Sequence, residues 1–240
     1  MYLFMFLLFP LLLAAWCFYK RDAHLIPAIV TGLVTAVLVC GFKAFFLYSH
    51  RIIPFSFESN VVYLLIRQTL LPVILVYGLF FLWSKDKISY KVDSLFPLLV
   101  SFYMLYLPYT IVSTAENVFT TFPLFIKPVL FAVMLFSIAL GAKHIEKTIL
   151  NKKFVFTAIW IIISIVNIIV PSLLEGMYIL NMNYILILAL SAVYSALLPL
   201  LFILSRLGVL TVKYGNIKAK KRTSQSEVLF FMYKKCHCRA

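Results

Sequence analysis

Acidic residues are scarce in this sequence. Its 240 residues include 8 Asp and Glu against 22 Lys and Arg, and only 12% are charged, whereas 64% are hydrophobic. No soluble domain of this size needs so much apolar sequence, and runs of about 18 or more apolar residues are typical of membrane spans. The shortage of charge therefore excludes an ordinary soluble enzyme and indicates a chain that lies largely in lipid.

Motifs for nucleotides and metals are also missing. The sequence has no Gly-rich phosphate-binding loop, so the chain does not power itself with ATP, and it has no His/Glu metal motif. Its four cysteines imply no disulfide framework. Cys236, His237 and Cys238 are adjacent in sequence, and three adjacent ligands do not readily surround one tetrahedral ion. We therefore expect no metal site and no cofactor.

What the sequence does contain is a series of continuous apolar runs separated by short polar loops. Continuous runs favour helices over the ~10-residue alternating segments of a membrane barrel. The predicted fold class is thus an all-α polytopic membrane helix bundle with about seven transmembrane helices. The predicted spans are 3–19, 25–48, 61–83, 95–114, 121–141, 154–171 and 180–205.

The basic residues of the loops predict the orientation of these spans. Loops after the first, third and fifth spans hold nine Lys and Arg, and nine more lie between Arg206 and Arg239. The alternate loops hold Arg51 alone. Because cytoplasmic loops carry the excess of Lys and Arg, this split predicts an outer N-terminus and a cytoplasmic C-terminus in a plasma or inner membrane. Since no basic n-region precedes the first run, we interpret it as a retained helix and not as a signal peptide.

The polar, basic C-terminal segment forms a second predicted region. Residues 1–206 form the predicted seven-helix transmembrane domain, and residues 207–240 form a flexible cytoplasmic tail. The net charge of +14 would suggest a nucleic-acid partner in a soluble protein, but here the charge lies in loops and tail. We expect the lipid bilayer as the main partner, anionic lipid at the tail and no nucleic acid. The tail could instead dock a cytoplasmic protein, and a membrane-protein partner of the chain is a further expectation.

Three basic residues lie inside the predicted spans. Lys43, Arg67 and Lys127 each lie about six residues from a predicted outer end, which corresponds to about 9 Å of helix. Three glutamates fall in the predicted outer loops: Glu58, Glu116 and Glu175. Three interpretations remain open for the cations, namely snorkelling to the interface, structural ion pairing, and a ligand-binding or catalytic site.

A polar stripe follows the fourth span towards the same side. Tyr103, Tyr106, Thr110, Ser113 and Asn117 recur at intervals of three and four residues, so they share one helix face. Hydroxyl groups on such a face commonly form hydrogen bonds across a helix bundle. The alternative interpretation is the polar wall of a cavity that opens outwards, with the eleven residues of the cations, glutamates and stripe as ligand-binding candidates.

Prolines inside the predicted spans indicate where the helices bend. Nearly every predicted span contains one, and we expect kinks at Pro72, Pro108 and Pro128, with Pro171 ending the sixth span. The common interpretation is the ordinary composition of membrane helices. The more specific interpretation is a hinge or a broken helix around a binding site.

Together these features favour a transporter or permease subunit with an outward-facing polar site for an anionic solute or a lipid headgroup. Two alternatives stay open. One is a membrane enzyme that acts on a lipid or lipid-linked substrate at the outer leaflet, with Glu58 or Glu116 as the acid–base group. The other is a non-catalytic subunit of a larger membrane assembly, held by the aromatic faces that 23 Phe and 14 Tyr provide.

Overall fold

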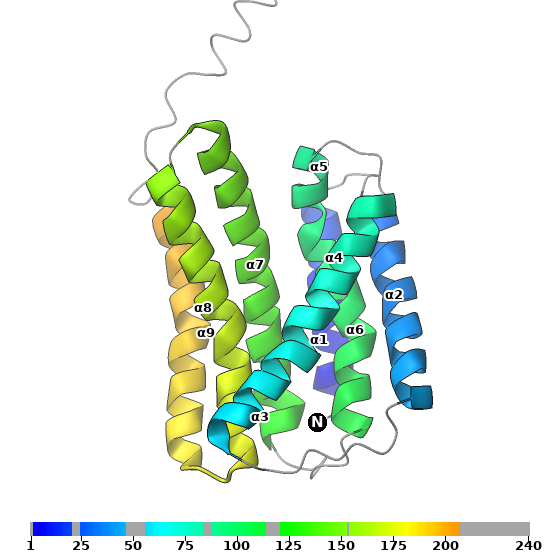
Figure 1. Cartoon of the computed structure of the whole chain (residues 1–240), viewed down its shortest axis with the longest axis vertical. Coiled ribbons are helices and arrows are strands. Elements are labelled where there is room, and N and C mark those ends of the chain that lie inside the picture. The colour runs from blue at the N-terminus through cyan, green and yellow to red at the C-terminus, as the bar shows by residue number, and fades with distance from the viewer. Residues whose placement is uncertain are drawn as a thin grey trace, which may run out of the picture. The chain divides into compact units, whose positions relative to one another are not determined.

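The computed structural model describes residues 2–20, 25–46, 56–83, 88–113, 121–152 and 154–206, and the regular structure in these ranges is entirely helical (Figure 1). The predicted tail, 207–240, lies outside the described residues. The elements are α1 (Tyr2–Lys20), α2 (Leu25–Phe46), α3 (Phe57–Leu64), η1 (Leu65–Leu70), α4 (Leu71–Trp83), α5 (Ile88–Asp93), α6 (Leu95–Ser113), η2 (Phe122–Ile126), α7 (Lys127–Leu150), α8 (Phe154–Ile179) and α9 (Tyr184–Arg206).

The chain divides after Ala196 into two compact units. The second unit begins at Leu197, and its described part is the last portion of α9, which ends at Arg206. The first unit contains the remaining elements, and all contacts discussed below lie within it.

Five helical segments in the described residues are long and apolar enough to cross a membrane. They are Leu25–Phe45, Phe57–Leu82, Lys91–Val112, Phe122–Leu150 and Phe154–Ile179, and two shorter apolar helices are Phe6–Phe18 and Tyr184–Leu197. Each of these segments coincides with one of the predicted spans. The helical fold and the integral membrane character are thus confirmed, while the count of seven spans stays a prediction.

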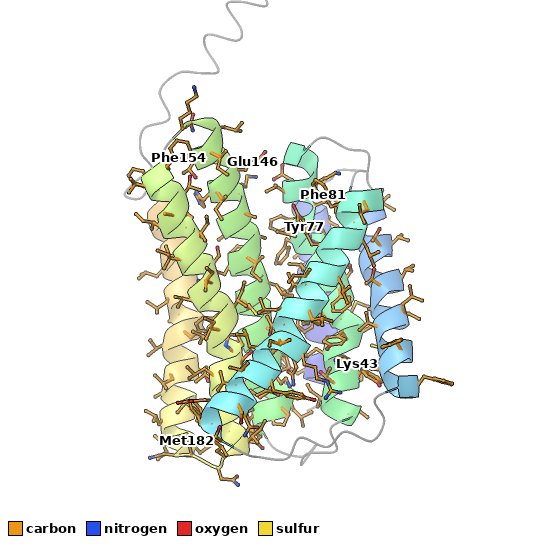
Figure 2. The ribbon with its side chains drawn as sticks, viewed as in Figure 1. Lys43, Tyr77, Phe81, Glu146, Phe154 and Met182 are labelled. Carbon is orange, nitrogen blue, oxygen red and sulfur yellow. The ribbon has the colours of Figure 1, made fainter. Side chains whose placement is uncertain are left out.

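Helix α6 is the central element of the first unit. It packs against α1, α2, α4 and α7, and most of its residues are buried, whereas most of α8 is not. Figure 1 shows that α1, α3 and α7 begin at the end of the bundle where α2, α6 and α8 finish. Lys43 and Met182 lie toward this end, and Phe81, Glu146 and Phe154 lie toward the other (Figure 2).

Aromatic side chains of α6 form the centre of the core. Phe102 and Tyr106 stack with ring centroids 5.0 Å apart, and Tyr103 lies 5.4 Å from Phe131 of α7. All four side chains are at most 1% exposed. Because lipid is as apolar as these side chains, such packing acts mainly through close van der Waals contact and not through exclusion of water.

The outer faces of the helices are apolar as well. On α8, Val155, Ile162 and Val166 are each more than half exposed, and α2 similarly presents Val37 and Leu38. A soluble protein rarely exposes so much contiguous apolar surface. These faces suit the hydrocarbon interior of a bilayer.

Two boundaries differ from the sequence-based expectation, at the ends of the fifth and sixth predicted spans. Pro171 does not end the sixth span, because α8 continues through it to Ile179. Glu175 consequently lies inside that helix and is buried, not in an outer loop. Lys143 and Lys147 belong to α7 and not to the loop that follows it. In α8, the buried side chains of Leu174 and Met177 continue the helix against its neighbours beyond the predicted boundary.

Close contact between α2 and α6 depends on a glycine. An added Cβ at Gly32 would collide with the Ser101 hydroxyl and with the backbone carbonyl of Leu98. Small residues let membrane helices approach in this way. Gly41, on the same helix, has nothing within 4 Å of an added Cβ.

We predict that Gly32→Ala lowers the stability of the protein by about 1–3 kcal/mol, because the backbone of α6 cannot move aside without cost. The matched variant Gly41→Ala should retain or slightly raise stability, since alanine is the better helix former. Thermal unfolding of both variants in mild detergent checks this. Equal unfolding midpoints for the two variants would contradict the close α2–α6 contact.

A second prediction concerns sidedness. In a chain whose native cysteines are replaced, Met182→Cys should react with a membrane-impermeant maleimide in intact cells, and Phe154→Cys only after permeabilisation. Both side chains are exposed, so reactivity reports access from one side of the membrane. The opposite labelling pattern would invert the orientation predicted from the loop charges.

Candidate functional site

The candidate site begins with a backbone irregularity before Pro72. Residues Leu65–Leu70 form a π-helical turn, which directs the Leu71 N–H to the carbonyl of Ile66. Pro72 has no N–H to donate. The carbonyls of Arg67 and Gln68 therefore lose the donors that an α-helix would give them, and in lipid they need another partner.

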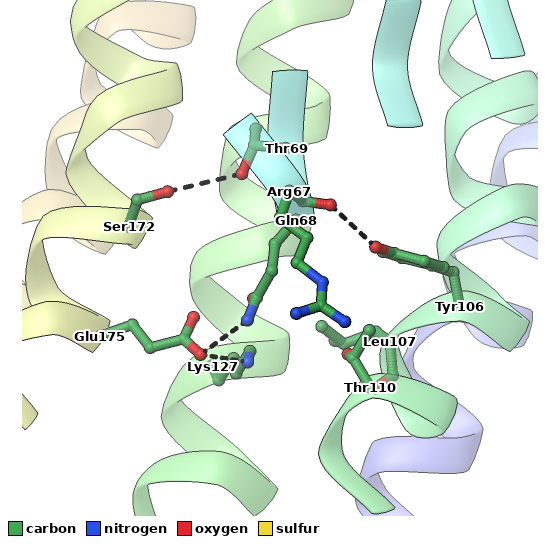
Figure 3. Close-up of polar contacts among 9 residues, drawn as sticks. All are labelled: Arg67, Gln68, Thr69, Tyr106, Leu107, Thr110, Lys127, Ser172 and Glu175. Carbon is green, nitrogen blue, oxygen red and sulfur yellow. Dashed lines mark hydrogen bonds and ion pairs between the residues drawn. The ribbon is translucent and has the colours of Figure 1, made fainter. Parts of the chain in front are cut away.

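Two tyrosines of α6 supply these missing donors. The Tyr103 hydroxyl donates to the Gln68 carbonyl over 2.9 Å. The Tyr106 hydroxyl donates to the Arg67 carbonyl over 3.0 Å, as Figure 3 shows. The stripe on α6 thus forms hydrogen bonds across the bundle, as one of the two interpretations expected. It also fixes the position of η1, the segment that carries the intramembrane arginine.

A second π-helical turn, η2, positions Lys127. The Lys127 N–H donates to the carbonyl of Phe122, and Pro128 follows directly, so the arrangement at Pro72 recurs here. Although π-helical turns are rare in proteins, those that occur often lie at functional sites. The kinks predicted at Pro72 and Pro128 thus correspond to local π-helical turns just before each proline.

Lys127 forms a buried ion pair with Glu175. Its Nζ lies 2.6 Å from Oε1 of Glu175, and the two side chains are 7% and 9% exposed. The same Oε1 accepts a hydrogen bond of 3.1 Å from Nε2 of Gln68 (Figure 3). This contact joins α7, α8 and η1, and it shows that Lys127 is not a snorkelling residue.

A hydroxyl pair supports the same junction. The hydroxyls of Thr69 and Ser172 lie 3.5 Å apart, one helix turn from the Gln68–Glu175 contact. Thr69 is fully buried and Ser172 nearly so. Three consecutive polar residues, Arg67, Gln68 and Thr69, therefore face a polar interface between η1 and its neighbours.

Lys43 reaches the junction from α2. Its ammonium donates a hydrogen bond to the hydroxyl of Tyr106 and also lies 4.5 Å from the centre of the Tyr106 ring. The positive charges of Arg67 and Lys127 are close enough to repel it. The three intramembrane cations therefore converge, as their shared depth in the sequence predicted.

Arg67 is the cation with the fewest partners. Within the described residues its guanidinium forms no hydrogen bond and no ion pair, and its contact is with the ring of Tyr63, 5.3 Å away. The side chain is partly buried and extends from η1 toward the level of Thr110 and Lys127 (Figure 3). Three cations and one carboxylate leave two positive charges in excess among the residues of this cluster.

Of the five remaining sequence-based candidates, two are described, and three lie partly or wholly outside the described residues. Glu58 is exposed in the first turn of α3. Thr110 is buried, and its hydroxyl donates to the Leu107 carbonyl on its own helix. Glu116 and Asn117 lie outside the described residues, as does the side chain of Ser113.

Sequence reasoning missed three members of the junction, Gln68, Thr69 and Ser172, and it also missed the buried Asn60 of α3. The available indication was the run of three polar residues from Arg67 to Thr69 inside an apolar span. Two buried atoms among them have no hydrogen-bond partner, Nδ2 of Asn60 and Oε1 of Gln68. Buried polar atoms without a hydrogen-bond partner are uncommon in folded proteins, so each of these two atoms calls for an explanation.

Within the described ranges, no three His, Cys, Asp or Glu side chains gather in a way that could hold a metal ion. Comparison with protein-family models, with curated proteins and with solved structures finds no match.

We predict that the Lys127–Glu175 pair is coupled energetically. Lys127→Met or Glu175→Gln alone should lower stability by about 3–5 kcal/mol, because each leaves one buried charge unpaired. The double variant should lose much less than the sum of the two.

The control for this cycle is the pair of Lys143 and Asp93, whose atoms lie 2.7 Å apart but whose side chains are 40% and 43% exposed. Lys143→Met should cost no more than about 1 kcal/mol, since solvent screens such pairs. Unfolding midpoints in mild detergent supply the four free energies. If the stability losses of Lys127→Met and Glu175→Gln were strictly additive in the double variant, the predicted interaction between the two side chains would be refuted.

Proposed function

We propose that the protein is a transporter or permease subunit that binds an anionic solute or lipid headgroup at the cluster of Lys43, Arg67 and Lys127. The site faces the outer half of a plasma or inner membrane, in the orientation that the loop charges predict. The observation that carries the proposal is the guanidinium of Arg67, which has no counter-ion among the described residues and lies beside two further cations.

The excess charge favours an anion as the ligand. A cation in the low dielectric of a membrane protein is costly without a partner, so intramembrane charges are usually paired or functional. Lys127 has Glu175, whereas Lys43 has only a neutral hydroxyl and Arg67 only a ring. A carboxylate or phosphate would supply the missing negative charge, and arginine binds such groups with two parallel hydrogen bonds.

The irregular helices favour transport over a purely structural role. Discontinuous or irregular segments commonly form the binding sites of secondary transporters. Here the two π-helical turns lie directly at Arg67 and directly before Lys127. A change at either turn would move a cation relative to its neighbours, which is the kind of local change that release of a bound anion requires.

We predict that Arg67→Leu removes anion binding while the protein still inserts and folds. Loss of a charged hydrogen bond of about 1.5–3 kcal/mol should weaken binding about 10- to 100-fold. The measurement is the unfolding midpoint in phosphatidylcholine nanodiscs with and without dimethyl phosphate, a phosphodiester monoanion. The wild-type protein should be stabilised by the anion and the variant should not.

The matched control is Lys147→Leu, which removes an exposed cation of α7 beside Glu146 at the opposite end of the bundle (Figure 2). It should keep the full stabilisation. A second arm uses phosphatidylglycerol nanodiscs without added dimethyl phosphate. Stabilisation in this arm would identify a lipid headgroup as the bound phosphodiester, whereas stabilisation only by dimethyl phosphate would identify a free solute. Equal stabilisation of wild type and Arg67→Leu in both arms would refute the proposed site.

A further inference from the structure

We propose that anion binding at this cluster is coupled to uptake of one proton by Glu175. This inference rests on the proposed function and deepens it, because it assigns a co-substrate to the same site. The bound anion takes the place of the Glu175 carboxylate at Lys127, and the displaced carboxylate receives a proton from water. No covalent bond other than the new O–H bond is formed.

The observation that leads to this proposal is that the side-chain oxygen of Gln68, Oε1, has no hydrogen-bond partner among the described residues. Gln68 is 6% exposed, its Nε2 donates to Oε1 of Glu175, and its own Oε1 has no partner. An ionised carboxylate only accepts hydrogen bonds, so it cannot satisfy that oxygen. A protonated carboxyl group carries one O–H donor, which can.

Protonation of Glu175 would complete a two-bond pairing between an acid and an amide. Nε2 of Gln68 already donates to Oε1, and a proton on Oε2 would let Glu175 donate back to Oε1 of Gln68. The contacts of the carboxylate with Gln68 and Lys127 both end on Oε1, which leaves Oε2 as the atom for the proton. The buried amide is thus satisfied only when Glu175 is neutral.

The cost of leaving a buried carboxylate without its cation favours the same coupling. With the pair intact, three cations and one carboxylate leave two positive charges in excess. If a monoanion bound to Lys127 while Glu175 stayed ionised, that carboxylate would be buried without its cation, which costs several kcal/mol. Protonation of Glu175 removes this cost.

The groups around Glu175 are consistent with a single proton acceptor. Lys127 of α7 and Arg67 of η1 are the charged neighbours, and Tyr106 of α6 is close enough to interact with the carboxylate charge. On α3, which also packs against α8, Glu58 is exposed and belongs to the surface. Among the described residues facing the junction, Glu175 is the carboxylate that Lys127 contacts.

The test is calorimetric titration of the wild-type protein with dimethyl phosphate in two buffers of different ionisation enthalpy. Dimethyl phosphate does not titrate near neutral pH, so any proton taken up belongs to the protein. We expect about one proton per bound anion and an affinity that rises about tenfold for each unit decrease in pH, because binding and protonation favour each other.

Infrared difference spectra of the same wild-type complex provide a second readout that needs no variant. Binding should produce the C=O band of a protonated carboxylic acid. In Glu175→Gln both the band and the proton uptake should vanish, whereas Glu146→Gln, the matched change at the far end of α7, should preserve them.

The outcomes separate the two proposals. Binding of dimethyl phosphate without proton uptake and without the carboxylic-acid band would overturn the coupling and leave the anion site standing. Proton uptake that persists in Glu175→Gln would also overturn it, by assigning the proton elsewhere. Absence of binding to the wild-type protein, in phosphatidylcholine or phosphatidylglycerol nanodiscs, would overturn the proposed function and the coupling together.

Discussion

The missing N–H of Pro72 is the constraint on which the junction depends. In lipid, a backbone carbonyl without a donor is costly, and no water is present to satisfy it. Here the π-helical turn at η1 and the proline leave the carbonyls of Arg67 and Gln68 to the hydroxyls of Tyr106 and Tyr103. The tyrosines must therefore lie on the face of α6 that meets η1, and this fixes the position of η1 relative to the buried helix α6.

The same bonds position the charged side chains. Once η1 is attached to α6, Gln68 points to Glu175 and Arg67 extends toward the level of Lys127 (Figure 3). Lys43 is added through Tyr106, whose hydroxyl accepts from the lysine while donating to the Arg67 carbonyl. Tyr106 thus links the hydrogen bond to the Arg67 carbonyl with the position of the Lys43 ammonium. A shift of η1 would therefore also move Lys43, and a shift of Lys43 would also move η1.

Of the three interpretations open for the intramembrane cations, no single one fits all three residues. Lys127 is a structural ion-pair partner, since its ammonium is buried against Glu175. Lys43 and Arg67 have neutral or aromatic partners instead, which leaves room for a ligand. For the enzyme hypothesis, one of the two acid–base candidates, Glu58, is exposed in the first turn of α3.

The sequence by itself determined the helical membrane fold, the approximate limits of the spans and the shared depth of Lys43, Arg67 and Lys127, because hydrophobic run length and loop charge are properties of local sequence. It also indicated the α6 stripe and the irregularities at Pro72 and Pro128. Only the tertiary structure decided that Glu175 lies inside α8, that it pairs with Lys127, and that Gln68 joins them. Those contacts connect residues 48 and 107 positions apart, and no local pattern specifies which helix faces which in a medium where every apolar face is equally well solvated.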